Sequence, residues 1–159
     1  MLKAKIKSLG ALKKIAAALR KKNKRIVFTN GCFDIMHLGH AKYLEEAKNK
    51  GDILIVGLNS DSSVRKIKGA KRPIVNEINR AGLLAALQSV DYVVLFKEDT
   101  PIKVIKALRP DVLVKGADWD RVDIVGAGFV SSLGGKVSTV KLLKGLSTSS
   151  LIKKIAETF

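Results

Sequence analysis

Both histidines of the chain, His37 and His40, lie in one short segment with Gly39 between them. Their spacing, at or near the start of a helix, places both imidazoles on one side and aims them at the same ligand. Imidazoles titrate at about pH 6.5, so they can donate hydrogen bonds to a charged phosphoryl group. A helix N-terminus also suits phosphate, and Gly39 leaves room for its approach. The segment therefore predicts a site that binds phosphate and stabilises the charge of phosphoryl-type transfer.

Three other interpretations of this segment remain open. Cys32, His37 and His40 could bind zinc, although zinc sites usually show three or four ligands at recognised spacings. Cys32 could be a nucleophile with a histidine base, but no third residue that would orient the base is evident. The histidines could also be ordinary helix-start residues. We favour the phosphate site and expect Cys32 to pack as a small apolar residue.

Short apolar, β-branched runs alternate with helical patterns from residue 25 onwards. Strands are expected at 25–30, 53–58, 92–96, 112–114 and 136–140, and helices at 38–50, 77–89, 100–109 and 147–156. This alternation predicts an α/β domain with a Rossmann-like, doubly wound, parallel five-stranded sheet covered on both faces. Such sheets bind ligands beyond the carboxyl ends of their strands, which is where residues 29–40 fall.

Length and composition favour one cytoplasmic domain. The chain has 159 residues, 47% of them hydrophobic, so we expect one domain at 25–159 with a basic helical extension at 1–24. No run approaches the roughly 18 apolar residues that would span a membrane, and the N-terminus lacks the apolar stretch of a secretion signal. Cys32 is the only cysteine, so no internal disulfide is possible.

The formal net charge of +16 first suggests a nucleic-acid ligand. However, only 5% of the residues are aromatic, and no nucleic-acid-binding motif can be recognised. Much of the charge lies in residues 3–25, interpreted as the solvated face of a helix, and in the short basic segment 65–72. We therefore expect no nucleic-acid partner.

The segment from Gly31 to His40 resembles the His-x-Gly-His signature of the cytidylyltransferase-like nucleotidyltransferase superfamily. The resemblance extends from about Arg25 to Lys154. It includes Asn59-Ser60-Asp61, Lys68-Gly69, Arg72-Pro73, Arg80, Val90-Asp91, Glu98-Asp99-Thr100-Pro101, Val114-Lys115-Gly116-Ala117-Asp118-Trp119 and Leu146-Ser147-Thr148-Ser149. Together these motifs are most similar to those of the D-glycero-β-D-manno-heptose 1-phosphate adenylyltransferases. The resemblance implies transfer of AMP from ATP to the sugar 1-phosphate, with release of pyrophosphate.

The resemblance also implies roles for individual residues. His37, His40, Lys68 and Arg80 would contact phosphate and stabilise the transition state, with Lys68 coming from a basic loop at 65–72. The nucleotide would be held by Thr29, Asn30, Gly31, Phe33, Lys115, Gly116, Ser147, Thr148 and Ser149. The substrate would be bound by Asp34, Asn59, Asp61 and Arg72, and Asp34 could instead contact a magnesium-bound group.

Several of these residues also have structural interpretations. Ser147 or Thr148 could serve simply as a helix cap, and Lys115 could be a charged residue at a strand end without a role in binding. Arg80 could form a salt bridge on its helix, and Trp119 could either pack or stack on a base.

The sequence departs from the family pattern at two places. Ile78 stands where an acidic residue often precedes the arginine, although Glu77 is adjacent. The segment Gly126–Gly135 is the least similar part, and we expect it to shape the acceptor pocket or a dimer edge.

The main alternative within the superfamily is a cytidylyltransferase that acts on glycerol 3-phosphate or another alcohol phosphate. Those proteins usually carry an arginine shortly before the Gly-x-Ser-Thr segment, and residues 140–147 contain none. Outside this class, the chain could be a non-catalytic nucleic-acid-binding module or a nucleotide sensor without turnover.

The resemblance further implies a cofactor and partners. Mg²⁺ would enter with ATP and be bound mainly through phosphate, so the sequence identifies no metal ligand. A separate heptose kinase would supply the substrate. Because members of the superfamily are commonly dimers, the resemblance also suggests a homodimer. No membrane partner is expected.

Overall fold

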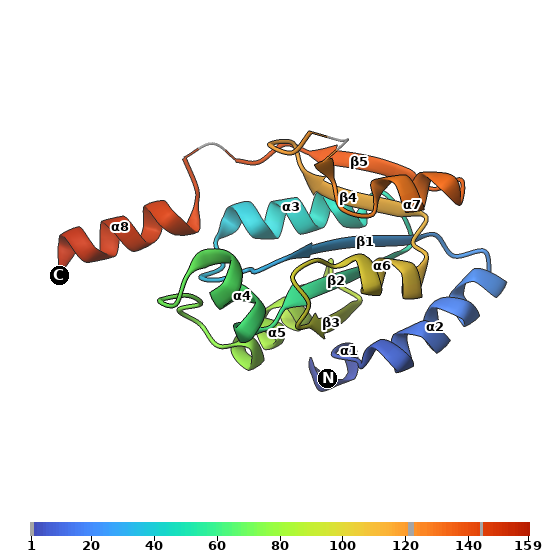
Figure 1. Cartoon of the computed structure of the whole chain (residues 1–159), viewed down its shortest axis with the longest axis horizontal. Coiled ribbons are helices and arrows are strands. Elements are labelled where there is room, and N and C mark those ends of the chain that lie inside the picture. Colours follow the sequence, from blue (N-terminus) through green and yellow to red (C-terminus); the bar gives the residue numbers. More distant parts are fainter. Residues whose placement is uncertain (1, 121–122, 144) are drawn as a thin grey trace.

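The computed structural model describes residues 2–120, 123–143 and 145–159 (Figure 1). One parallel sheet, in the order β3-β2-β1-β4-β5, contains β1 (Ile26–Gly31), β2 (Ile53–Asn59), β3 (Tyr92–Phe96), β4 (Val112–Gly116) and β5 (Lys136–Val140). The helices are α1 (Leu2–Lys5), α2 (Leu9–Lys21), α3 (Leu38–Lys48), α4 (Asp61–Lys68), α5 (Glu77–Ala86), α6 (Ile102–Leu108), α7 (Ala127–Ser132) and α8 (Thr148–Thr158). Within these ranges, no helix combines the length and apolar character required to cross a bilayer.

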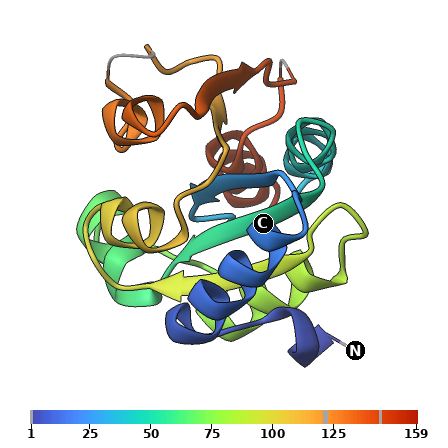
Figure 2. The same cartoon turned by 90° about the vertical axis from the view of Figure 1, so that its right-hand side faces the viewer.

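Helices cover both faces of the sheet, as Figures 1 and 2 show. Side chains of α3 and α5 pack on one face, and those of α2, α6 and α7 pack on the other. Neighbouring strand residues point into opposite layers: Val27 belongs to the first core and Phe28 to the second. Because both faces are buried, the strands read as continuous apolar runs. The predicted doubly wound, five-stranded fold is confirmed.

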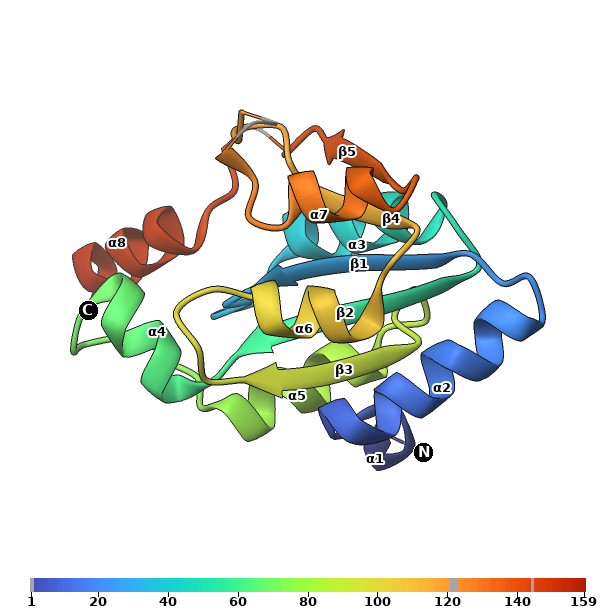
Figure 3. The same cartoon turned by 45° about the vertical axis from the view of Figure 1, so that its right-hand side comes forward.

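The strand order places the loop after β1 at the middle of the carboxyl edge. The chain runs from β1 through β2 to β3 on one side, and then returns to β4 and β5 on the other. The order therefore reverses between β1 and β4, and a crevice forms at such a switch point. Figure 3 shows α4 and α8 at this end of the molecule, with the C-terminal end of α2 at the opposite end.

The segment expected as an N-terminal extension packs against the rest of the chain. Leu12 and Ala16 of α2 are completely buried against the sheet. Ahead of α2, Ile6 pairs with Val93 beside β3, and the Lys5 ammonium donates to the Leu87 and Val90 carbonyls at 3.0 and 2.7 Å. The segment contains the helices α1 and α2, and α2 forms part of the hydrophobic core.

Two local expectations are corrected. The first half of the basic loop expected at 65–72 is helix, because α4 continues to Lys68 and ends at Gly69, whose φ is 97°. The segment Gly126–Gly135 contains the unpredicted α7, which is too short for its periodicity to be recognised and is fixed by buried Val130. Lys144, within the stretch 140–147 that distinguishes the acceptor classes, lies outside the described residues.

Candidate active site

His37 and His40 lie side by side where the loop after β1 enters α3. Their rings stack with centroids 3.9 Å apart and planes 26° apart. The His37 backbone N–H donates to Nδ1 of His40 at 3.4 Å, and the Phe33 ring meets His40 edge-on at 5.5 Å. The helix start thus brings the two imidazoles together, as their spacing suggests.

Both imidazoles are neutral at pH 7. Burial, followed by the neighbouring His37, lowers the pKa of His40 to about 4. Burial also lowers the pKa of His37. Among the described residues, Nδ1 of His37 and Oδ1 of Asn30 are buried polar atoms without a hydrogen-bond partner. Asn30 lies near the end of β1 and His37 at the start of α3, and unpaired buried polar atoms of this kind indicate a polar ligand.

The backbone around the histidines is shaped for this packing. A Cβ on Gly39 would lie 2.9 Å from Nδ1 of His37, so a side chain at position 39 would displace the ring. Phe33 and Ile35 have φ values of 46° and 47°, which are uncommon for residues other than glycine. Strained conformations of this kind concentrate at functional sites, where the surrounding structure maintains them.

A cavity of about 510 Å³ opens at the carboxyl edge beside this loop. Eleven of the expected site residues line it: Asn30, Gly31, Phe33, Asp34, His40, Asn59, Lys68, Arg72, Lys115, Thr148 and Ser149. Other expected residues are absent from the lining, namely Thr29, His37, Asp61, Arg80, Gly116 and Ser147. His37 nevertheless stacks on His40, which does line the cavity.

The Asp34 carboxylate joins two loops at the edge of the cavity. It accepts hydrogen bonds from Nε of Arg72 at 2.7 Å and from the N–H groups of Ile74 and Val75 at 2.9 Å each. Burial raises the pKa of Asp34, but these hydrogen bonds outweigh it and hold the pKa below its usual value. Its carbonyl accepts from Oγ1 of Thr148 at 2.8 Å. Asp34 therefore has a structural role in this arrangement, and its expected contact with substrate or magnesium stays a prediction.

Arg80 is completely buried and does not face the cavity. Its guanidinium donates to the carbonyls of Val75 at 2.8 Å, Cys32 at 2.6 Å and Asn59 at 2.9 Å. It also pairs with Asp61 at 2.7 Å. These acceptors belong to the loop after β1, the end of β2, the start of α4 and the loop before α5. In this arrangement Arg80 holds the loops in place and is not exposed to phosphate, and Asp61 is its ion-pair partner.

Three other expected contacts are also structural in this arrangement. Thr29 is buried, with Oγ1 2.7 Å from the Tyr43 hydroxyl. Gly116 faces Asp118 so closely that a Cβ would collide with that carboxylate. Ser147 caps α8 by accepting from the Ser150 N–H at 3.0 Å.

Two lysines supply positive charge to the cavity. Lys68, at the end of α4, is exposed. Lys115 is half-buried at the end of β4, and burial lowers its pKa to about 8. The Lys115 ammonium lies 5.6 Å from the centroid of the Trp119 ring. Both lysines are placed to meet an anion that enters the cavity.

Some of the lining was not assigned from the sequence: Cys32, Ile67, Asp99, Thr100, Pro101, Trp119 and Val125. Asp99, Thr100 and Trp119 stand in recognisable motifs that follow β3 and β4, so their place after strand ends was a usable signal. Ile67 and Val125 carry no such signal. Within the described ranges, no group of three or more His, Cys, Asp or Glu is placed to hold a metal ion.

Similar proteins were found at the levels of family, sequence and structure. Residues 28–152 match the family model described as cytidylyltransferase-like. The chain is 54% identical over 152 residues to the bifunctional protein HldE of Geotalea uraniireducens, covering 96% of this chain and 31% of that protein. It is 52% identical over 156 residues to HldE of Geobacter metallireducens, covering 98% and 32%. The chain therefore spans about a third of the length of these relatives.

Solved structures agree with this result. The lipopolysaccharide core biosynthesis protein of Thermoplasma volcanium superposes with a TM-score of 0.63 at 34% identity, over 76% of this chain and 98% of that one. The pantoate-beta-alanine ligase of Francisella tularensis also has a TM-score of 0.63, over 96% of this chain and 77% of that one. At 16% identity it shows the fold alone. From its matched residues, its parallel sheet and the paired histidines after β1, the chain belongs to the cytidylyltransferase-like family of nucleotidyltransferases.

Proposed function

We propose that the protein transfers AMP from ATP to D-glycero-β-D-manno-heptose 1-phosphate, giving ADP-heptose and pyrophosphate. The observation that carries the proposal is the stacked, neutral histidine pair, with one orphaned nitrogen, at a cavity that also presents Lys68 and Lys115. The sequence motifs favour the heptose acceptor. The likeness to a lipopolysaccharide core biosynthesis protein points in the same direction.

The reaction is an in-line substitution at the α-phosphorus of ATP. An oxygen of the sugar 1-phosphate forms a bond to that phosphorus, and the bond from the α-phosphorus to the bridging oxygen of the β-phosphate breaks. Pyrophosphate leaves with the electron pair, and no covalent enzyme intermediate is needed. The protein contributes alignment of two polyanions and stabilisation of the charge that builds on the α-phosphate.

The histidines suit this work because they are neutral and desolvated before ATP binds. A neutral imidazole carries one N–H donor, and its hydrogen bond to a phosphoryl oxygen strengthens as that oxygen gains charge. Lys68 would neutralise the departing pyrophosphate from the end of α4. Arg72 lines the cavity, but its Nε is bonded to Asp34, so it would reach phosphate with its remaining donors.

The two ends of the cavity differ in chemistry. Asn30, Lys115, Thr148 and Ser149 would hold the nucleotide, since they surround the side of the cavity between β1, β4 and α8. Asn59, Asp99 and Thr100 follow β2 and β3 and offer hydrogen-bonding groups for sugar hydroxyls. The residues fit a magnesium ion that keeps most of its ligands from phosphate and water, and the orphaned Asn30 Oδ1 is an oxygen that could join them. Such an ion would neutralise polyphosphate charge.

The partners follow from this reaction. A kinase must supply the sugar 1-phosphate, and we place both steps in the cytoplasm, where ATP is available. We also propose a homodimer, because α8 has an exposed apolar Ile155 and no buried residue among its members. Sedimentation of the purified protein at several concentrations tests the dimer.

Pyrophosphate release with magnesium tests the function directly. The panel crosses ATP, CTP, GTP and UTP with both anomers of heptose 1-phosphate, glycerol 3-phosphate and glucose 1-phosphate. Turnover confined to ATP and the β-anomer of heptose 1-phosphate is expected. Turnover with CTP and glycerol 3-phosphate would keep the reaction class and overturn the acceptor and base.

A further inference from the structure

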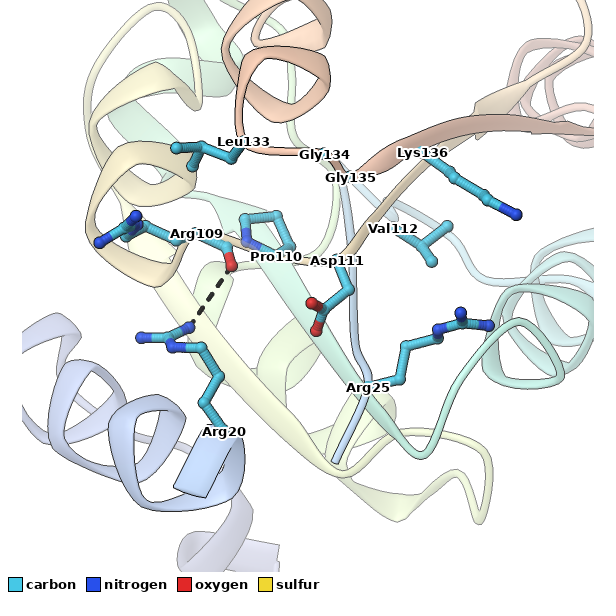
Figure 4. A pocket seen from close by; sticks show the side chains of 10 residues that line it. All are labelled: Arg20, Arg25, Arg109, Pro110, Asp111, Val112, Leu133, Gly134, Gly135 and Lys136. Carbon is cyan, nitrogen blue, oxygen red and sulfur yellow. Dashed lines mark hydrogen bonds between the residues drawn. The ribbon is translucent and has the colours of Figure 1, made fainter. Parts of the chain in front are cut away.

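A second hollow lies at the amino edge of the sheet, opposite the candidate active site (Figure 4). It measures about 310 Å³ and is formed where α2 ends, where α6 leads into β4 and where α7 leads into β5. A neighbouring hollow of about 290 Å³ shares Arg20, Arg25 and Asp111 with it and adds Lys24. Neither hollow shares a residue with the candidate active site.

Positive charge dominates these two hollows. Arg20, Lys24, Arg25, Arg109 and Lys136 line them, and Asp111 is the acidic residue present. One carboxylate oxygen of Asp111 already accepts the Ile26 N–H at 2.7 Å. Lys24 pairs with Asp52 at 3.5 Å, outside the hollows. In the described part of the chain, Arg25, Arg109 and Lys136 form no ion pair.

Neutralisation of helix ends accounts for one of these cations. The carboxyl end of α6 points to the hollow, and the Arg20 guanidinium donates to the Leu108 carbonyl at 2.7 Å. The Figure 4 view shows Arg20 reaching the Arg109 carbonyl from one side, while Arg25 and Lys136 extend on the other side of Asp111. Arg25 and Lys136 stand at strand starts, shortly after the carboxyl ends of α2 and α7, and in the described part of the chain neither side chain donates to a helix carbonyl as Arg20 does.

The N-terminal sequence adds positive charge to this region without acidic residues to balance it. Residues 1–25 contain ten Lys and Arg and no Asp or Glu. Like charges gathered around a concave surface repel one another, and they focus a field that attracts multivalent anions. Guanidinium groups match the geometry of phosphate oxygens with paired hydrogen bonds.

We propose that the hollow at the amino edge of the sheet is a binding site for a small, multiply charged phosphate compound, separate from the catalytic cavity. Arg25 and Lys136 supply the binding charge on one side of Asp111, and Arg109 supplies it on the other side. Arg20, held by the α6 carbonyl, fixes one wall. Such a site would bind either an inorganic phosphate compound or the phosphate group of a metabolite, and the probes below distinguish the two.

Amide NMR of the ¹⁵N-labelled full chain tests the proposal with pyrophosphate, orthophosphate and ADP as separate probes at low ionic strength. The amides of Gly134 and Gly135 report on the hollow, whereas those of Gly31, in the catalytic cavity, and Gly39, beside His37, report on the candidate active site. We expect saturable shifts at Gly134 and Gly135 with pyrophosphate. Saturation by ADP but not by the inorganic probes would also support the site and assign it to a metabolite.

The double variant Arg109→Gln/Lys136→Gln should weaken these shifts by about tenfold or more, since two charge-assisted contacts are lost. The shifts at Gly31 and Gly39 should remain. The matched control Lys13→Gln/Lys14→Gln removes two exposed charges from α2 outside the hollow and should leave both sets intact. Lys136→Gln alone, at an exposed strand start, is the fallback if the double variant does not fold. No saturable shift at Gly134 and Gly135 with any probe, or equal weakening in the control, would overturn the proposal.

Discussion

At the scale of single residues, the two histidines and Arg80 were all expected to contact phosphate, but the structure places them in different surroundings. His37 and His40 stack at the entrance of α3 with one nitrogen unpaired. Arg80 is buried under the same loop and donates four hydrogen bonds to its neighbours. The histidines are therefore candidates for chemistry, whereas Arg80 positions the loop that carries them.

Replacing either histidine by alanine should lower kcat/KM by about 100-fold or more, because a donor to the reacting phosphoryl group is lost. The double variant should lose much less than the product of the two effects, since the rings act as a pair. Pyrophosphate release measures the rates, and thermal unfolding should change little. Lys42→Ala, at an exposed position of the same helix, is the matched control. Near-normal turnover in both single variants would rule out the catalytic assignment.

Stability should decline on acidification between pH 6.5 and about 4. The pKa of His40 is lowered from 6.5 to about 4, and that of His37 is lowered as well. Within this window the unfolded chain binds protons that the folded chain does not, so lower pH favours unfolding. The contribution is fully present above the unfolded pKa and disappears as the pH approaches 4. The pKa of Asp34 is lowered from 3.8, so protonation of Asp34 affects the stability only below this pH window.

Urea midpoints measured across this pH range check the prediction. His40→Gln should show a flatter dependence than the parent protein. Equal slopes for the two proteins would contradict the role of the buried imidazole.

Arg80→Met should destabilise the fold by about 3–5 kcal/mol, because it leaves Asp61 and buried carbonyls unpaired. Urea unfolding measures the free energy. Arg65→Met, at an exposed position of α4, should cost far less. If the variant kept the parental stability and had a raised KM for ATP, Arg80 would instead be assigned to phosphate binding.

At the scale of elements, α8 is attached to the site through its first turn. Thr148 Oγ1 donates to the Asp34 carbonyl at 2.8 Å, and Thr148 and Ser149 line the cavity. No residue of α8 is buried, and Figure 1 shows the helix extending away from the sheet. This helix therefore has little tertiary packing to stabilise it.

Hydrogen exchange should be faster in α8 than in α3, and ATP with magnesium should slow it because the nucleotide contacts the first turn. Mass spectrometry of the peptides that cover 148–158 measures both effects. Thr148→Val should reduce the protection by ATP, and Thr158→Val, at the far end of α8, is the control. Slow exchange in the ligand-free protein would show that another surface covers α8.

At the scale of the whole molecule, α2 contributes to the same core as the sheet. Leu12 is completely buried, and its layer includes Phe28 of β1 and Leu108 of α6. Leu12→Ala should therefore cost about 2–5 kcal/mol of stability, as expected for a buried leucine. Urea unfolding measures it, with exposed Leu2→Ala as the control. Equal stabilities of the two variants would mean that Leu12 contributes little to the core.

The sequence by itself determined the order of the five strands, the doubly wound architecture, and the pairing of His37 with His40. These features depend on local periodicity and on spacing within one helix start, which can be read along the chain. The identity of the carboxyl edge as the site followed from the same pattern.

Only the tertiary structure decided which polar residues face the cavity. Arg80 and Asp34 stand in recognisable motifs, yet their partners are 48 and 38 residues away, as in the bonds from Arg80 to Cys32 and from Arg72 to Asp34. Whether a charged group meets solvent or a carbonyl depends on how separate loops pack together, and residue type does not encode that packing. The basic hollow at the opposite edge arises in the same way, because α2, α6 and α7 end beside one another only in the folded chain.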